Sequence, residues 1–98
     1  MSFLRKLLGL GPKVNHRDWI KEGGVVIDVR SAAEFKSGHA KGAVNIPLDR
    51  IGEVAKKYKK DQKIILCCRS GMRAGNAKSQ LKTQGYQHLV NVGAWQNV

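Results

Sequence analysis

"KIILCCRSGMRAGNAKSQLKTQG" (residues 63–85) joins a strand pattern, a loop pattern and a helix pattern without interruption. Its first six residues form a short apolar run, which is typical of a strand that is buried on both faces of a sheet. After the loop, Ala74, Ala77 and Leu81 recur at the spacing of one helix face, and Gly85 marks the end of that helix. The stretch therefore predicts one strand–loop–helix unit of an α/β protein with a parallel sheet.

The rest of the chain repeats this alternation of strands and helices. The predicted strands cover residues 25–29, 63–68 and 88–92, and residues 42–48 hold a further short strand that Pro47 ends. Helical patterns lie between them, with Asn15, Ser31 and Asp49 as candidate N-caps. We expect one α/β domain whose parallel sheet carries helices on both faces, and in such a sheet ligands bind beyond the carboxyl ends of the strands.

The totals indicate one small domain. The chain has 98 residues, of which 42% are hydrophobic, and this composition favours an ordered core. The basic and apolar start, residues 1–12, is interpreted as a retained arm, with a membrane-surface helix as the alternative, and residues 13–98 as the domain. No stretch approaches the ~18 apolar residues that a membrane span requires.

The charge of the chain favours anionic partners. The formal net charge is +11, from 18 basic and 7 acidic residues, and such a balance attracts anions. The lysine-rich residues 56–60 are interpreted as the solvated end of a helix. Neither a zinc-finger spacing nor an aromatic RNA-recognition motif is present, so we expect no specific nucleic-acid binding.

Cys68 stands where the predicted strand ends and the loop "CRSGMR" begins. The thiolate is the nucleophilic form of cysteine, and a helix N-terminus and neighbouring arginines lower the pKa of the thiol. Gly71 permits a tight bend whose N–H groups point inward, and Arg69 and Arg73 add positive charge. This pattern predicts a reactive thiolate that also attracts an anion. The alternatives are an inert buried cysteine and arginines in surface ion pairs.

Cys67 needs a separate interpretation, because alternation along a strand sends it to the opposite face from Cys68. We expect it to pack under a covering helix. A strained disulfide between the two neighbours is the alternative. Two adjacent cysteines cannot form a framework of structural disulfides, so a cytoplasmic location is expected.

Three segments together resemble the rhodanese-like sulfurtransferases. "CRSGMR" (68–73) is similar to the family's active-site loop, "IDVRSAAEFKSGHAKGAVNIPL" (27–48) to its N-terminal signature, and "VNVGAWQNV" (90–98) to its C-terminal signature. The resemblance covers residues 13–98. It implies a single domain with a parallel sheet of about five strands, the first of them near residues 13–15.

The resemblance also implies a chemistry. The Cys68 thiolate would attack the outer sulfur of thiosulfate, release sulfite and keep the sulfur as a persulfide, which a thiol or cyanide then takes. Residues of the loop would bind the substrate, while Asp28 and Arg30 would support the site as a strand-end ion pair. The substrate-binding set is Arg69, Ser70, Gly71, Met72 and Arg73. No metal or organic cofactor is implied, and a monomer is expected.

Two alternatives remain at this point. One is a persulfide carrier that a sulfur-relay partner protein loads, with little turnover of free thiosulfate. The other is a phosphatase, because related phosphatases and arsenate reductases resemble this loop but separate cysteine and arginine by one residue more. Four residues separate Cys68 from Arg73, and this smaller loop favours sulfur over phosphate.

Overall fold

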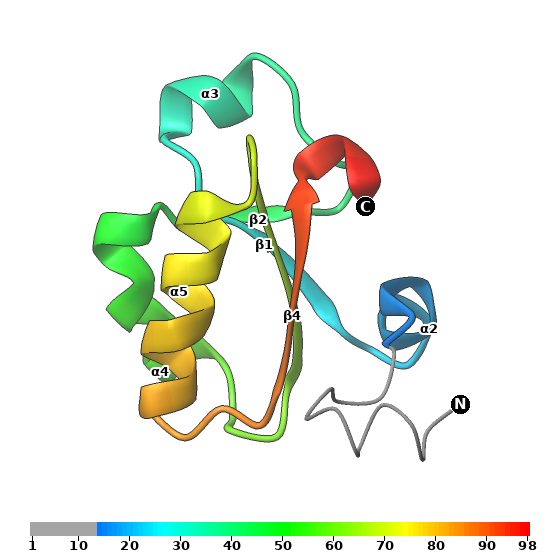
Figure 1. The fold of residues 1–98 in the computed structure, drawn as a ribbon, viewed down its shortest axis with the longest axis vertical. Coiled ribbons are helices and arrows are strands. Elements are labelled where there is room, and N and C mark those ends of the chain that lie inside the picture. The colour runs from blue at the N-terminus through cyan, green and yellow to red at the C-terminus, as the bar shows by residue number, and fades with distance from the viewer. Residues whose placement is uncertain (1–13) are drawn as a thin grey trace, which may run out of the picture.

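The protein is described here by a computed structural model that covers residues 14–98, and its centre is a sheet of four strands (Figure 1). The strands are β1 (Val25–Asp28), β2 (Val44–Asn45), β3 (Lys63–Cys68) and β4 (His88–Ala94). Their order is β2-β1-β3-β4, and every neighbouring pair is parallel. The predicted α/β class with a parallel sheet is confirmed.

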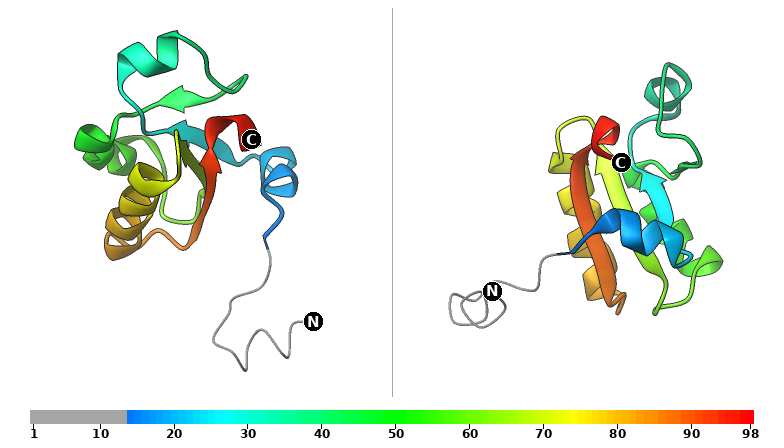
Figure 2. Two further views of the ribbon diagram at one scale, coloured as in Figure 1. Left: turned by 45° about the horizontal axis from the view of Figure 1, so that its top comes forward. Right: turned by 90° about the vertical axis from the view of Figure 1, so that its right-hand side faces the viewer.

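Helices cover both faces of the sheet, as Figure 2 shows. The helical elements are α2 (His16–Lys21), α3 (Ala32–Lys36), η1 (Leu48–Glu53), α4 (Val54–Lys57), α5 (Met72–Thr83) and η2 (Trp95–Asn97). One face packs against α5, η1 and α4, and the other packs against α2 and η2. The helix α3 follows β1 and lies at the end of the sheet where the β3–α5 loop also lies (Figure 1).

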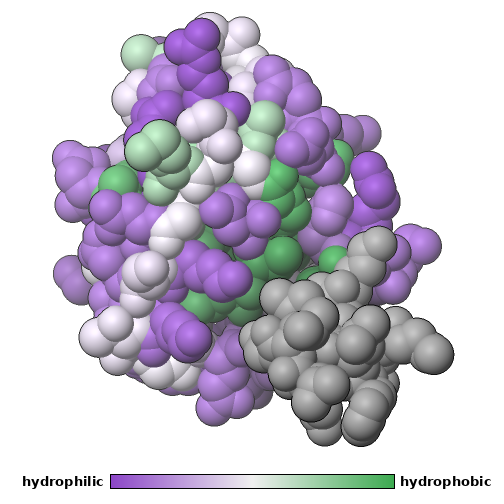
Figure 3. All heavy atoms as spheres, in the orientation of Figure 1, coloured by the Kyte–Doolittle hydropathy of each residue, from purple (hydrophilic) through white to green (hydrophobic). Residues whose placement is uncertain are grey.

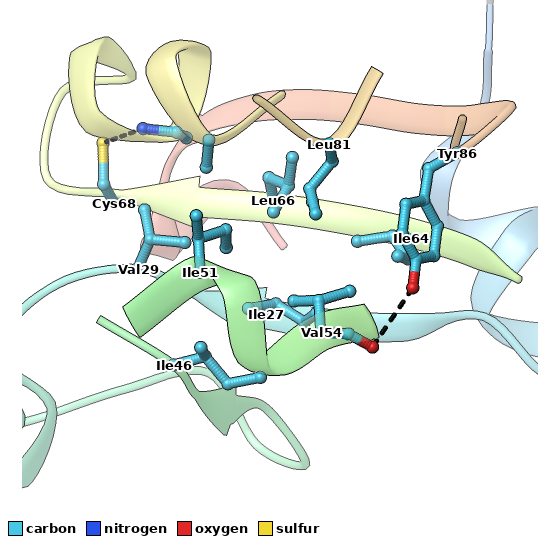
Figure 4. Close-up of a cluster of buried hydrophobic side chains, with 12 residues drawn as sticks. Ile27, Val29, Ile46, Ile51, Val54, Ile64, Leu66, Cys68, Leu81 and Tyr86 are labelled. Carbon is cyan, nitrogen blue, oxygen red and sulfur yellow. Dashed lines mark hydrogen bonds between the residues drawn. The ribbon is translucent and has the colours of Figure 1, made fainter. Parts of the chain in front are cut away.

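The main core lies between the sheet and α5. The predicted stripe of Ala74, Ala77 and Leu81 is fully buried there. Figure 4 shows Leu81 beside Leu66 of β3 in this core. Tyr86 closes the far end of the core, because its hydroxyl donates to the carbonyl oxygens of Val54 and Tyr58. This core fixes β3 against α5 and therefore fixes both ends of the loop between them.

Two sequence-based expectations, the strand near residues 13–15 and the Asp49 cap, need correction. The strand expected near residues 13–15 is absent from the described part of that segment, because Asn15 is the N-cap of α2 and its side chain accepts from the N–H of Arg17; Lys13 lies outside the described residues. The short strand expected within 42–48 and before Pro47 is β2, Val44–Asn45. Asp49 is no cap, because η1 already begins at Leu48 and no side chain caps it.

The described residues on the face drawn in Figure 3 are mostly hydrophilic. Figure 3 shows a narrow apolar band in the region of β4, bordered by hydrophilic residues. Within residues 14–98, no helix has the length and apolar character needed to cross a membrane. The arm expected at residues 1–12 lies outside the described residues.

Candidate active site

Cys68 is the last residue of β3, and the loop that follows it bends back over its sulfur. Gly71 makes this bend with φ = 104°, a conformation that side chains other than glycine disfavour. A Cβ atom at Gly71 would also lie 3.3 Å from the Cα atom of Gly93. The backbone conformation therefore favours glycine at this position, and the close approach of β4 leaves little room for a side chain.

The loop and the first turn of α5 direct backbone N–H groups at the Cys68 sulfur. The N–H of Gly71 donates to Sγ over 2.9 Å, and the N–H of Ala74 donates over 3.5 Å; Figure 4 shows Cys68 at the edge of the core, near Val29 and Ile51. Cys68 exposes only 1% of its surface. We call these N–H groups the amide cradle.

The cradle changes the acidity of Cys68. Burial raises the pKa of the thiol, but hydrogen bonds from the N–H groups of Ala74, Gly71, Ser70 and Arg73 outweigh burial. The net result is a pKa below the ordinary value of a thiol. Hydrogen bonds to the charged form stabilise that form, so the structure favours a thiolate at this position.

Cys67 has the opposite character. Its side chain belongs to a second buried cluster, with Val26 and Ile65, on the other face of the sheet. Burial raises its pKa to about 12, with a further contribution from the charge of Asp28. Both cysteines are free. Cys67 therefore has the core position that strand alternation predicts.

A buried ion pair lies next to the loop. Arg30 donates from Nε and Nη2 to the carboxylate of Asp28, with the shortest distance 2.7 Å, and both residues are at most 5% exposed. The same Nη2 donates to the carbonyl oxygen of Gly38 over 2.7 Å, and the guanidinium lies 5.0 Å from the centre of the Trp95 ring. The pair thus connects β1 with the segment after α3 and with η2.

Arg73 forms a second, more exposed ion pair with Glu34 of α3. Its Nη1 and Nη2 atoms donate to the two carboxylate oxygens over 2.6 and 2.9 Å. The hydrogen bond from Arg73, together with those from Ser31, lowers the pKa of Glu34 to about 2. Glu34 also completes a capping box with Ser31. Sequence reasoning missed this contact, although Glu34 lies in the quoted N-terminal signature.

Asn91 is the second residue that sequence reasoning missed. Its Nδ2 donates to the carbonyl oxygen of Gly71 over 2.9 Å, and its Oδ1 accepts from the N–H of Gly93. The register of β4 against β3 shifts in this region, which brings β4 close to the loop. An asparagine inside the apolar run 88–92 was the available signal, because a polar side chain that is partly shielded from water needs hydrogen-bond partners.

The outer side of the loop is open to solvent. Arg69 and Ser70 are exposed, and Met72 is 83% exposed. Two shallow hollows flank the loop. One, of about 280 Å³, is lined in part by Arg69 and Trp95; the other, of about 550 Å³, is lined in part by Arg73.

His39 lies apart from the cradle and holds a turn. Its Nδ1 atom lies 2.7 Å from the carbonyl oxygen of Phe35, and the two rings stack with centroids 3.7 Å apart. Within residues 14–98, no group of three or more His, Cys, Asp or Glu side chains is placed to hold a metal ion.

A buried thiol at a strand end, surrounded by backbone N–H groups at the start of a helix, is an arrangement that favours the nucleophilic thiolate. The chain belongs to the family of rhodanese-like domains, because the sequence model of that family matches residues 14–97. The family implied by the three sequence motifs is therefore confirmed. It comprises sulfurtransferases and sulfur carriers.

Individual relatives fit this assignment. The thiosulfate sulfurtransferase PspE of Escherichia coli (strain K12) is 32% identical over 74 residues, which are 74% of this chain and 71% of PspE. YrkF of Bacillus subtilis (strain 168), named as a candidate sulfur carrier, is 33% identical over 67 residues, which are 68% of this chain and 36% of YrkF. A solved structure described as a rhodanese with anions from E. coli superposes with a TM-score of 0.70 at 31% identity, covering 76% of this chain and 91% of that one. The chain spans about half the length of two further curated relatives.

Proposed function

We propose that this protein is a sulfurtransferase that moves a sulfane sulfur from thiosulfate, through a persulfide on Cys68, to a thiol. The observation that carries the proposal is the amide cradle, because it favours the ionised form of a sulfur that is otherwise shielded from water. Membership of the rhodanese-like family supports it. The likeness to a thiosulfate sulfurtransferase supports the choice of donor.

In the first half-reaction, the Cys68 thiolate attacks the outer sulfur of thiosulfate. A new sulfur–sulfur bond forms, the original one breaks, and sulfite leaves with its electron pair. The terminal sulfur of the persulfide carries the negative charge, and N–H groups of the loop, such as that of Gly71, which donates to Sγ, would stabilise it. No proton moves in this step, since both nucleophile and leaving group are anions.

In the second half-reaction, an acceptor thiolate attacks the terminal sulfur of the persulfide. The acceptor becomes a persulfide and the Cys68 thiolate is restored; cyanide would leave as thiocyanate in the same way. Two separate half-reactions on one nucleophile predict ping-pong kinetics. Exposed Ser70 and Met72 border the path by which donor and acceptor reach the loop, and Arg69 and Arg73 supply positive charge there.

Mass spectrometry tests the proposal directly. Wild-type protein incubated with thiosulfate should gain the mass of one sulfur atom and lose it again when cyanide is added. Cys68→Ser should gain none, whereas the matched Cys67→Ala variant should still load. A wild type that neither gains the mass nor produces thiocyanate would refute the proposal.

A sulfur carrier is the second candidate, and the likeness to YrkF favours it. A carrier would load faster from a cysteine desulfurase acting on cysteine than from free thiosulfate. Comparing the two loading rates at equal donor concentration separates the candidates. Both free cysteines suit a reducing compartment such as the cytoplasm, and we propose that the protein acts there as a monomer.

A further inference from the structure

The two arginines of the loop have different surroundings. Arg73 gives both terminal nitrogens to Glu34, at 2.6 and 2.9 Å. Arg69 is exposed, and within residues 14–98 it forms no ion pair. The charge of Arg73 is therefore balanced by a carboxylate of the same chain, while the charge of Arg69 is available to an incoming molecule.

The Glu34 carboxylate accepts several hydrogen bonds within the chain. Its Oε1 accepts from Arg73 and also from the backbone N–H and hydroxyl of Ser31, which is the N-cap of α3. Separating Arg73 from Glu34 would break a bidentate, charge-assisted contact, and such contacts are stronger than neutral hydrogen bonds. An anionic donor that binds the Arg73 guanidinium would therefore compete with a carboxylate that already balances its charge.

Arg30, the other arginine close to the loop, also has partners within the chain. It is paired with buried Asp28 and with the carbonyl oxygen of Gly38. Arg69 follows Cys68 directly in the chain, and consecutive Cα atoms lie about 3.8 Å apart. Its charge is therefore carried by the residue next to the one that bears the sulfur. It also borders the hollow of about 280 Å³ beside Trp95.

We propose that the two arginines divide the work: Arg69 binds the anionic end of the sulfur donor, and Arg73 is a positioning residue that Glu34 holds in place to join α3 to the loop. This inference rests on the proposed function and deepens it, since it names the donor-binding side chain and the chemistry that side chain selects. It predicts a preference for small anionic donors over neutral ones.

Alkylation of Cys68 tests the role of Arg69 without any sulfur transfer. Iodoacetate is an anion and iodoacetamide is neutral, so the ratio of their rates reports the positive charge that an incoming anion meets. Arg69→Gln should lower this ratio by about threefold or more, because one charge near a surface site contributes on that scale. Arg69→Lys should keep most of it. Arg17→Gln, the matched control on α2, should leave the ratio unchanged.

The thiosulfate KM should follow the same order. Arg69→Gln should raise KM by about tenfold, the scale of one hydrogen bond to a charged group, with a smaller change in kcat. Equal ratios and equal KM values for Arg69→Gln and Arg17→Gln would overturn the inference. If thiosulfate is not turned over at all, the proposed function fails, but the alkylation ratio still decides the role of Arg69.

A double-mutant cycle tests the role of Arg73. Arg73→Gln leaves the Glu34 carboxylate unpaired beside the loop, so KM for thiosulfate should rise and the alkylation ratio should fall. Glu34→Gln/Arg73→Gln removes that carboxylate too, and both quantities should return toward wild type while kcat stays low because the tie to α3 is lost. If Arg73 itself binds the donor, the double variant will keep the raised KM, and the inference is wrong.

Discussion

Asn91 donates its side-chain N–H to the carbonyl oxygen of Gly71 over 2.9 Å, and its own carbonyl oxygen accepts from the N–H of Gly93. One amide thus connects β4 with the loop that surrounds the Cys68 sulfur. The Gly71 N–H, on the same residue, is the nearer of the two hydrogen-bond donors to Sγ described above. The position of the amide cradle therefore depends on β4 as well as on β3 and α5.

Asn91→Ala should weaken both the fold and the cradle. Loss of the two hydrogen bonds should lower the free energy of unfolding by about 1–2 kcal/mol, because each partner is left in a half-buried place. The pKa of Cys68 should rise, because Gly71 is less firmly held. Urea unfolding and the pH dependence of iodoacetamide alkylation measure the two effects. Asn76→Ala, on the exposed side of α5, is the matched control, and equal results for the two variants would contradict the assignment.

Gly71→Ala should damage the site more than the fold. The substitution places a side chain at φ = 104° and a Cβ atom 3.3 Å from Gly93, and a loss of about 1–2 kcal/mol is expected from the backbone conformation alone. Gly85→Ala, at φ = 99° with only the Lys60 side chain near the added Cβ, at 4.0 Å, should cost a similar amount of stability. Only Gly71→Ala should raise the pKa of Cys68 and slow loading from thiosulfate. A Gly85→Ala variant that is equally inactive would show that general instability is the cause.

The two cysteines should differ sharply in their response to pH. Burial of Cys68 raises its pKa, but hydrogen bonds from N–H groups outweigh this and leave it below the ordinary value. Burial raises the pKa of Cys67 to about 12. Native protein should therefore incorporate iodoacetamide at Cys68 below the pH at which an ordinary thiol reacts, and peptide mapping should find Cys67 unmodified. Early labelling of Cys67 in folded protein would contradict the structure.

The same shifts predict how stability depends on pH. The lowered pKa of Cys68 adds stability above the thiol's unfolded pKa, and this contribution is lost as the pH falls through the folded pKa. Cys67 acts in the opposite direction: between the ordinary value of 9.0 and about 12, its unfolded form ionises and stability falls as the pH rises. Urea unfolding of Cys67→Ala should accordingly show a weaker loss of stability in this alkaline range than wild type. An unchanged alkaline slope would argue against the buried state of Cys67.

Asp28→Asn should be among the most damaging single substitutions. It removes the carboxylate from a pair in which Asp28 and Arg30 expose 0% and 5% of their surfaces, and leaving a buried charge unpaired costs about 3–5 kcal/mol. Glu53→Gln breaks the exposed pair with Arg50 and should cost less than about 1 kcal/mol. Thermal unfolding of the two variants measures the difference. A small effect of Asp28→Asn would mean that Arg30 finds other partners.

The sequence was sufficient for the parts of the fold that depend on local pattern. Continuous apolar runs that alternate along the chain with helical patterns predicted the parallel sheet. The serine before the helical pattern that begins at Ala32 predicted the Ser31 cap. The boundaries of β2 and the nature of η1 were not predictable in this way. They depend on Pro47, whose ring excludes an N–H, and on hydrogen bonds of Ile46 and Leu48 to the strand-end residues Asp28 and Val29.

The residues of the candidate site also fall into two groups: those that a local sequence pattern indicates and those that depend on folding. Cys68 and Gly71 could be identified from the sequence alone, because their residue types and their spacing form a recognisable pattern within one loop. Glu34 and Asn91 lie 34 residues before Cys68 and 20 residues after Gly71 in the chain, and only folding brings them to the loop. The pairing of Arg73 with Glu34 illustrates the limit: its charge was evident from the sequence, but the carboxylate that balances it was not.

Cys67 and Cys68 are adjacent at the end of β3, and their geometry determines whether one could take a sulfur from the other. They project from opposite sides of one strand, and neighbouring Cα atoms, about 3.8 Å apart, are closer than an ordinary disulfide accommodates. The chain contains no third cysteine. In the proposed cycle, Cys67 would therefore not take the sulfur from a Cys68 persulfide, and a thiol of another molecule would have to accept it.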